Sequence, residues 1–351
     1  MTMQHVYVIA EAGVNHNGSL ALAMQLALAA QRAGADAVKF QTFRAKDVVT
    51  PTAATADYQK ANTGASNQFD MIRGLELDED QHRALAAYCA EIGIEFFSTP
   101  FSEAALAQLV RLGVRRIKLP SGEITNKALI ECAADTGLPL IVSTGMSSLD
   151  EVRQALAWIS ERWQLRGHPP PDSAQLTVMH CTSAYPAPAD SLNLKAIQTL
   201  ADAIGLPIGY SDHSEGIEAA LAAVALGAVA IEKHLTLDKA MPGPDHRASA
   251  EPSEMAALVL AIRKVQSMLG DGIKQAHSVE FNTRDVARRS IVVIRDLPKG
   301  HVLTPADLAL RRPGTGLPPS QWNQVIGSLL AKDMPAHTTL TSSDLVDTAL
   351  S

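Results

Sequence analysis

Two histidines follow consecutive apolar runs near residues 210 and 230. His213 comes after PIGYSD and His234 ends AIEKH, and both runs have the composition of buried strands. Neighbouring parallel strands lie about 4.8 Å apart, so two imidazoles at matching heights could share one metal ion. Two nitrogens with water or carboxylate oxygens suit Mn²⁺, Co²⁺ or Mg²⁺ better than structural zinc. Either histidine alone could serve only as a hydrogen-bonding group, but the pair favours a divalent metal site, with Mn²⁺ as the first choice.

Two lysines and several hydroxyl residues occupy the same kind of position at the ends of other apolar runs. They are Lys39, Lys118, Thr99, Ser121, Ser143 and Ser211. Lysine supplies a point charge and hydroxyls supply directional donors, so the set matches a ligand that carries a phosphate and a carboxylate. A strand-end lysine could instead be a Schiff-base nucleophile, which borohydride would trap. Two lysines among hydroxyls, with a metal pair nearby, favour anion binding.

Four acidic residues complete the candidate reactive groups. Glu11, Glu123 and Glu232 could transfer protons or orient a water or a ligand. Each could instead only pair with a neighbouring lysine, and for Glu232 the two interpretations are equally good. Asp245 ends the loop MPGPD, in which two prolines restrict the backbone. Its carboxylate could hold sugar hydroxyls or merely shape a turn.

The elements that must position these groups alternate along the first 270 residues. Short β-branched or apolar runs alternate with Ala- and Leu-rich stretches, as is typical of a parallel sheet covered by helices. Eight such units favour a closed (β/α)₈ TIM barrel, in which catalytic residues gather at the carboxyl ends of the strands. No GxGxxG follows the first strand, which weighs against a dinucleotide-binding sheet. The expected strands are Val6–Ala10, Ala37–Gln41, Glu95–Thr99, Arg116–Leu119, Pro139–Ser143, Thr177–His180, Pro207–Ser211 and Ala230–His234.

Two segments depart from this alternation. The connection between Phe43 and Leu77 is long and polar, and such loops tend to be lids or binding loops. Near the C-terminus, DLPKGHVLTPADL returns 37 residues later as DMPAHTTLTSSDL, which predicts a small, pseudo-symmetric, β-rich domain with two capped turns. We therefore expect a barrel domain over 1–270, a linker over 271–284 and the small domain over 285–351.

Composition restricts the class of partner. The chain of 351 residues has a net charge of −7 and no block of like charges, which argues against nucleic acid or an anionic membrane as the main partner. Its three cysteines form no CxxC pair, so a disulfide framework or a thiolate zinc site is not expected. No apolar run approaches the length of a membrane span, and the N-terminus lacks a basic leader region. We expect a cytoplasmic protein.

The motifs around these residues resemble those of the sialic acid synthase family, which includes legionaminic acid synthases, and the resemblance spans the whole chain. The C-terminal repeat resembles the antifreeze-like (SAF) domain of these synthases. The motifs are EAGVNHNGS (11–19), VKFQTF (38–43), FFSTPF (96–101), KLPSGE (118–123), VSTGM (142–146), HCTSAYPAP (180–188), GYSDHS (209–214), IEKHLTLDKAMPGPDH (231–246) and LRRPGTG (310–316).

The resemblance implies a role for each matching residue. His213 and His234 would hold the metal that polarises a sugar aldehyde, and Glu123 would handle the proton of the attacking water. Phosphoenolpyruvate would be bound by Lys39, Thr99, Lys118, Ser121, Ser143 and Ser211, and the open-chain sugar would be positioned by Glu11, Gln41, Tyr185 and Asp245. Better-known members have an asparagine where this chain has Ser183.

The resemblance also implies a homodimer and a reaction. Arg312, in RRPGTG, resembles the family arginine that reaches from one subunit's small domain into the partner's barrel. The expected activity is N-acetylneuraminate synthase, which condenses phosphoenolpyruvate with N-acetylmannosamine and water. An alternative within the family is N,N′-diacetyllegionaminate synthase, which uses 2,4-diacetamido-2,4,6-trideoxymannose. A non-catalytic carbohydrate-binding protein is a further alternative, but the complete set of strand-end residues argues against it.

Overall fold

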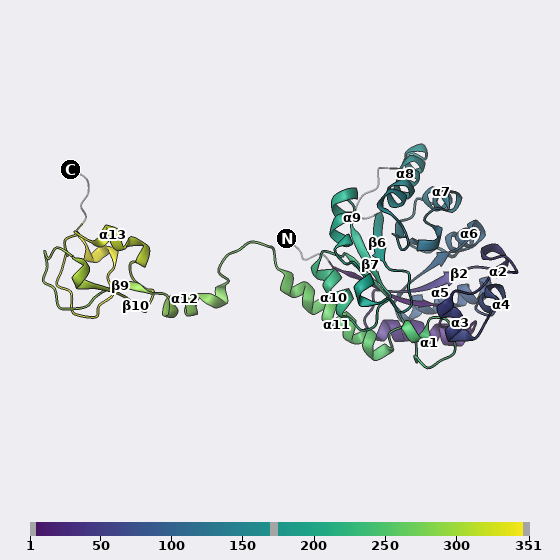
Figure 1. Cartoon of the computed structure of the whole chain (residues 1–351), viewed down its shortest axis with the longest axis horizontal. Coiled ribbons are helices and arrows are strands. Elements are labelled where there is room, and N and C mark those ends of the chain that lie inside the picture. The colour runs from purple at the N-terminus through teal and green to yellow at the C-terminus, as the bar shows by residue number, and fades with distance from the viewer. Residues whose placement is uncertain (1–4, 169–174, 347–351) are drawn as a thin grey trace. The chain divides into compact units, whose positions relative to one another are not determined.

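The computed structural model describes residues 5–168 and 175–346 (Figure 1). The chain divides into two compact units, Met1–Asp271 and Gly272–Ser351. The first contains an eight-stranded parallel sheet with helices around it, and the second contains a small antiparallel sheet. In the described residues, no helix is long and apolar enough to cross a membrane.

All eight predicted strands are present, and the predicted (β/α)₈ fold is confirmed. The sheet order is β3-β2-β1-β8-β7-β6-β5-β4, so the first and last strands pair and the sheet curls toward closure. Among the described strands, no ladder joins β3 to β4. The strands are β1 (Tyr7–Gly13), β2 (Ala37–Thr42), β3 (Glu95–Pro100), β4 (Ile117–Leu119), β5 (Leu140–Ser143), β6 (Leu176–Cys181), β7 (Ile208–Asp212) and β8 (Ala230–His234).

The helices of this unit begin and end where local signals predict. Asp78 and Ser148 cap α5 and α8 in capping boxes with Gln81 and Glu151. Gly93 ends α5 at a φ of +77°, a left-handed conformation that a residue without a Cβ adopts readily. The helices are α1 (Leu20–Arg32), α5 (Glu79–Ile92), α6 (Glu103–Leu112), α7 (Lys127–Asp135), α8 (Leu149–Leu165), α9 (Ala196–Ile204), α10 (Glu218–Ala225) and α11 (Pro252–Leu269).

Strand alternation separates two apolar layers. One layer lies between strands and helices and contains most of the buried apolar side chains. The other fills the barrel interior with Ile9, Ala37, Phe97, Ile141, Met179 and Ala230. Because side chains on a strand alternate faces with a period of two, the residues two positions later point into the barrel just above this plug. Those residues are Glu11, Lys39, Thr99, Ser143, Cys181 and Glu232.

The segment between β2 and α5 is ordered by three short helices. They are α2 (Ala45–Val48), α3 (Asp57–Thr63) and α4 (Gln68–Arg73), where the sequence predicted a polar loop. The Asn67 side chain caps α4 by accepting from the backbone N–H of Asp70. An ion pair between Arg44 and Glu76, with an N–O distance of 3.2 Å, ties the start of the segment to its end.

The second unit is built on the repeat. It contains α12 (Phe281–Ala287), α13 (Trp322–Val325) and an antiparallel pair, β9 (Ser290–Val293) and β10 (Leu308–Arg311). Its core includes Ile291, Val293, Leu303, Leu308, Leu330 and Leu340. The two predicted capped turns are confirmed, since Thr304 with Asp307 and Thr341 with Asp344 form equivalent capping boxes.

Candidate active site

A cavity of 530 Å³ lies at the carboxyl ends of the barrel strands. Most of the predicted site residues line it, which places residues of seven separate motifs around one space. Those that line it are Lys39, Gln41, Thr99, Lys118, Ser121, Ser143, Tyr185, Ser211, His213, Glu232, His234 and Asp245. Glu11, Glu123 and Arg312 are not among the lining residues.

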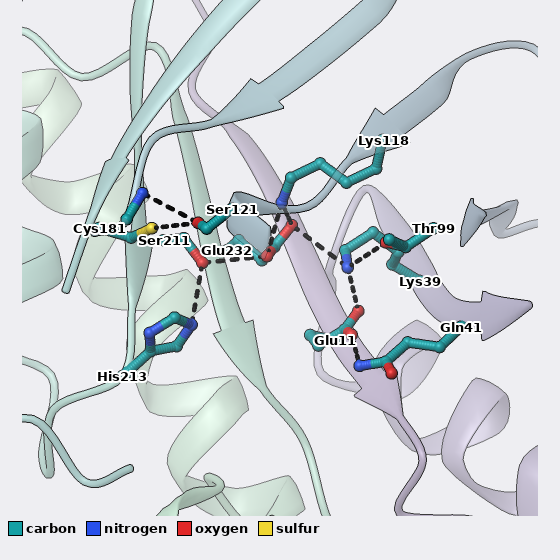
Figure 2. A network of polar contacts seen from close by, with 11 residues as sticks. Glu11, Lys39, Gln41, Thr99, Lys118, Ser121, Cys181, Ser211, His213 and Glu232 are labelled. Atoms are coloured by element: carbon teal, nitrogen blue, oxygen red, sulfur yellow. Dashed lines mark hydrogen bonds and ion pairs between the residues drawn. The ribbon is translucent and has the colours of Figure 1, made fainter. Parts of the chain in front are cut away.

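Two buried lysines, Lys39 and Lys118, form the floor of the cavity with the buried Glu232, and the buried Glu11 contacts this floor through Lys39 (Figure 2). Lys39 Nζ lies 2.7 Å from Glu11 Oε2 and donates to Thr99 Oγ1 at 3.0 Å. Lys118 Nζ donates to both carboxylate oxygens of Glu232 at 2.8 and 2.7 Å. The same carboxylate lies 3.7 Å from Lys39 Nζ, so the four groups form one connected network.

Burial and mutual charge set the protonation of this network. Burial raises the pKa of Glu11 to about 7, although Lys39 opposes the shift. Burial also acts to raise the pKa of Glu232, but Lys118 and Lys39 outweigh it and hold that pKa below its ordinary value. Glu232 is therefore an anion at neutral pH, while Glu11 can exchange a proton there. Glu232 does pair with a lysine, and its predicted role in proton transfer or orientation stays a prediction.

Hydroxyl and thiol groups line the side of the cavity next to Lys118. Ser211 Oγ donates to Glu232 Oε1 at 3.0 Å, and Ser121 Oγ accepts from the backbone N–H of Gly145 at 2.9 Å. Cys181 Sγ lies 3.2 Å from Ser121 Oγ, and Figure 2 shows it facing the same network. Sequence reasoning missed Cys181 as a lining residue. Its position two residues after the interior residue Met179 was the available signal.

The two histidines lie side by side at the edge of this network. Their ring centroids are 5.4 Å apart and their planes are at 66°. Nδ1 of His213 is 2.7 Å from the carbonyl oxygen of Thr182, which can only accept, so Nδ1 carries the proton and Nε2 keeps its lone pair. Nδ1 of His234 is buried without a hydrogen-bond partner. Burial lowers the pKa of both imidazoles, so both are neutral at pH 7.

This donor set fits a divalent ion held by two protein nitrogens. Neutral imidazoles are the form that binds metals, and a buried unpartnered nitrogen is costly unless something binds it. Among the described residues, no group of three or more His, Cys, Asp and Glu side chains converges as a metal site. A metal held by His213 and His234 would therefore keep positions open for water or substrate oxygens.

Three candidate sugar-binding residues, Gln41, Tyr185 and Asp245, line the same cavity. The ring of Tyr185 is centred 4.3 Å from that of His213, and Gln41 donates to Glu11 Oε1 at 3.3 Å. Asp245 is buried in the loop after β8, and burial raises its pKa to about 6. Asn62 of α3 donates to the Pro244 carbonyl at 2.7 Å, which joins that loop to the segment between β2 and α5.

Glu123 and Arg312 have other surroundings within their own units. Glu123 is partly exposed on a short turn after β4, where its carboxylate accepts from the Asn126 side chain at 2.7 Å. Arg312 is exposed in the second unit, after β10. The roles that the resemblance implies for these two residues stay predictions.

An apolar wall faces the charged floor, and sequence reasoning missed it. Val14, Phe43 and Leu75 form a separate buried cluster with Val48, Ile72 and Phe101 packed against it. All six line the cavity. The segment between β2 and α5 is polar on average, so no periodic pattern indicated that its few apolar residues would gather on one side.

Comparison with known proteins decides the family. The NeuB family model matches residues 26–274, and the SAF domain model matches residues 288–346. The chain belongs to the NeuB family. It is 49% identical to N,N′-diacetyllegionaminic acid synthase from Legionella pneumophila, with 95% of this chain and 93% of that protein covered.

Two further similarities agree with this family. The chain is 42% identical to N,N′-diacetyllegionaminic acid synthase from Campylobacter jejuni, over 94% of this chain and 97% of the other. Among solved structures, the N-acetylneuraminic acid synthetase of Leptospira borgpetersenii, in complex with citrate, superposes with a TM-score of 0.69 at 35% identity. That match covers 80% of this chain and 90% of the other.

Proposed function

We propose that this NeuB-family enzyme is an N,N′-diacetyllegionaminate synthase, which condenses phosphoenolpyruvate with 2,4-diacetamido-2,4,6-trideoxymannose and water. The sequence analysis named N-acetylmannosamine as the first acceptor and this sugar as the alternative. The two relatives at 49 and 42% identity carry the name of the alternative and favour it.

The apolar wall is the structural observation that carries the choice of acceptor. The diacetamido sugar has three methyl groups, two on its acetamido substituents and one at C6, whereas N-acetylmannosamine has one methyl group and a C6 hydroxyl. Six apolar side chains beside a polar floor suit the first sugar, because each buried methyl group is worth about 0.8 kcal/mol. A wall without donors also leaves the C6 hydroxyl of N-acetylmannosamine unpaired.

The charges of the cavity argue against a phosphorylated acceptor. Among the described residues that line it, the cations are Lys39 and Lys118. Both are buried, and both are already paired with glutamates at the floor. A donor with a phosphate and a carboxylate needs both lysines, so no lining cation is left for a second phosphate.

The floor residues suit phosphoenolpyruvate. We assign Lys39 and Thr99 to its carboxylate, and Lys118 with Ser121, Ser143 and Ser211 to its phosphate. In the reaction C3 of phosphoenolpyruvate attacks the aldehyde carbon, water adds at C2, and phosphate leaves with cleavage of its C–O bond. Fixed charges and hydroxyls at the floor hold the donor in position and stabilise the leaving phosphate.

The remaining residues hold the acceptor and move protons. We propose that His213 and His234 bind a divalent ion, Mn²⁺ in the first instance, which as a Lewis acid would polarise the aldehyde oxygen. Gln41, Tyr185 and Asp245 would orient the open-chain sugar. Glu11, whose pKa of about 7 suits proton exchange, supports a role in proton transfer beside that proposed for Glu123.

We extend the proposal to a cytoplasmic homodimer in which Arg312 acts in trans, as the family resemblance implies. A mixture of Arg312→Ala and His213→Ala subunits tests it. If the arginine acts in trans, mixed dimers pair an intact barrel with an intact Arg312 and regain activity that neither variant has alone. Failure of the mixture to regain activity, with subunit exchange verified, would contradict the assignment.

The acceptor is tested by measuring phosphate release with both sugars. We expect kcat/KM to be larger for 2,4-diacetamido-2,4,6-trideoxymannose than for N-acetylmannosamine, and Ile72→Ser to reduce that ratio by about 10-fold. Leu260→Ser, at an exposed position of α11, is the matched control and should leave the ratio unchanged. A higher kcat/KM for N-acetylmannosamine in the wild type would return the assignment to N-acetylneuraminate synthase. If neither sugar consumed phosphoenolpyruvate, the proposed function would fail.

A further inference from the structure

A buried ion pair lies on the outer face of the strands that carry the two histidines. Tyr210 and Ile231 belong to the apolar layer between strands and helices, so Asp212 and Lys233, two residues later on each strand, face the same way. These two residues are only 1% and 2% exposed. They face away from the cavity, and the mechanism above does not use them.

Among the described residues, the hydrogen bonds of this pair come from β7, β8 and the turn after β7. Lys233 Nζ donates to Asp212 Oδ2 at 2.8 Å and also to the carbonyl oxygen of Ser214. The other carboxylate oxygen of Asp212 accepts from the backbone N–H of Ser214 at 2.9 Å and from its hydroxyl at 2.6 Å. The pair therefore joins the two strands and also fixes the first residues of the turn.

Each histidine is covalently next to a member of this pair. Asp212 and Lys233 are direct partners in the β7–β8 ladder. His213 lies between Asp212 and Ser214, and His234 follows Lys233. Any change in the distance between the two charged side chains would therefore move both imidazole rings. Outside this pair, His213 is also held by the Thr182 carbonyl, by Ser211 Oγ at 3.3 Å from its Nε2 and by the Tyr185 ring. Nδ1 of His234, by contrast, has no hydrogen-bond partner.

Stability alone is a weak reason for burying these charges. Replacing a buried ion pair by apolar residues is often neutral or stabilising, because desolvation offsets the attraction. The same face of both strands carries apolar or aromatic residues one pair earlier, at Tyr210 and Ile231, so apolar packing is feasible there. An ion pair differs from apolar packing in fixing direction and distance between two strand ends.

We propose that the Asp212–Lys233 ion pair positions His213 and His234, and thereby sets the affinity of the site for a divalent metal. Neither residue touches the metal or the substrate, so both are positioning residues. Supporting groups behind metal ligands typically contribute about 10- to 100-fold in metal affinity. The inference rests on the metal site of the proposed function.

The test measures Mn²⁺ binding to the full chain without substrates, by electron paramagnetic resonance of free Mn²⁺ and by calorimetry. The variant Lys233→Met removes the positioning charge, and Asp212→Asn keeps the side-chain size while removing the opposite charge. Arg116→Met is the matched control. It breaks the Arg116–Glu95 ion pair, with an N–O distance of 2.8 Å, at the opposite end of the strands. Thermal unfolding of every variant is measured alongside.

We expect Lys233→Met and Asp212→Asn to weaken Mn²⁺ binding by about 10- to 100-fold. Arg116→Met should stay within about twofold of wild type, although it lowers the melting temperature. Wild-type affinity in a folded Lys233→Met or Asp212→Asn protein would overturn this inference and leave the metal proposal standing. Equal losses of affinity in Arg116→Met would overturn it too, because a general loss of stability would then be the cause. If the wild type bound no divalent ion, the metal proposal itself would fail first.

Discussion

The buried charges at the barrel mouth and those in the small domain have different partners. At the barrel mouth, Lys39, Lys118, Glu11 and Glu232 pair with each other around a cavity. In the small domain, Asp307 is fully buried among hydrogen-bond donors. Its carboxylate accepts from the Thr304 backbone N–H at 2.9 Å, the Thr304 hydroxyl at 2.7 Å and His301 Nε2 at 3.0 Å, and Arg295 completes the set.

The difference shows what each group of charges is for. Asp307 is surrounded by donors from its own turn and from residues a few positions earlier, so its charge holds the turn in place. The mouth lysines contact carboxylates from other strands and also face open space, so a ligand anion can compete for them. Buried charge with local donors indicates structure, and buried charge beside a cavity indicates a binding site.

The largest loss of activity and stability is expected when one of the two lysines at the barrel mouth is replaced. Lys118→Met should lower kcat/KM for phosphoenolpyruvate by about 10²- to 10³-fold, as loss of one donor to a developing anion does. It should also lower the free energy of unfolding by about 3–5 kcal/mol, because Glu232 stays buried with Lys39 Nζ, at 3.7 Å, as the remaining lysine partner. Steady-state phosphate release and denaturant unfolding measure the two effects. Lys264→Met, on the exposed side of α11, is the control. An unchanged kcat/KM in the Lys118 variant would contradict the interpretation that the buried charges beside the cavity bind a ligand.

Removing the charge of Asp307 should lower the stability of the small domain without changing metal binding by the barrel. Asp307→Asn should lower the free energy of unfolding of the small domain by about 1.5–3 kcal/mol, the value of hydrogen bonds to a charged group. Trp322 fluorescence reports this unfolding, because Trp158 and Trp163 lie on α8 of the barrel and can be replaced by phenylalanine. The affinity of the barrel for Mn²⁺ should not change. A change in that affinity would show that the two sets of charges are coupled.

The same aspartate should give the small domain a dependence on pH. Burial acts to raise the pKa of Asp307, but hydrogen bonds from His301, Thr304 and Arg295 outweigh it and hold the pKa below its ordinary value. A lowered carboxyl pKa contributes stability that is fully present above the unfolded value of about 3.9 and is lost as pH falls through the folded value. The stability difference between wild type and Asp307→Asn should therefore shrink below about pH 4. A constant difference from pH 6 to pH 3 would contradict the assignment.

The smallest loss of stability is expected when the equivalent aspartate in the second half of the repeat, Asp344, is replaced. Asp344 accepts from the Thr341 backbone N–H and hydroxyl, both at 2.7 Å, and pairs with Lys332. It has one cation, Lys332, where Asp307 has an arginine and a histidine. Because Asp344 has one charged or hydrogen-bonding partner fewer, Asp344→Asn should cost less than Asp307→Asn in the same denaturant titration. An equal or larger loss would show that the cap, and not the cation, carries the stabilisation.

Much of the fold could be predicted from the sequence, because its signals lie in patterns that span two to four residues. The strand positions, the capping boxes of Asp78 and Ser148 and the two capped turns of the small domain depend on neighbours along the chain. The convergence of His213, His234 and the two lysines also followed, because carboxyl ends of parallel strands meet at one end of a barrel. The apolar wall could not be predicted from the sequence, because Ile72 and Phe101 come from separate segments that no common hydrophobic periodicity links.

The sequence by itself determined which side chains stand at the strand ends, because a period of two assigns each strand residue to a face. Only the tertiary structure decided which of those groups pair. Lys118 meets Glu232 across 114 residues, and Asp212 meets Lys233 behind the histidines. Such pairs depend on register and on side-chain length across the closed barrel, which no local pattern encodes. For the two histidines, residue type predicted a metal site, while the separation of their rings depends on how β7 and β8 are held together.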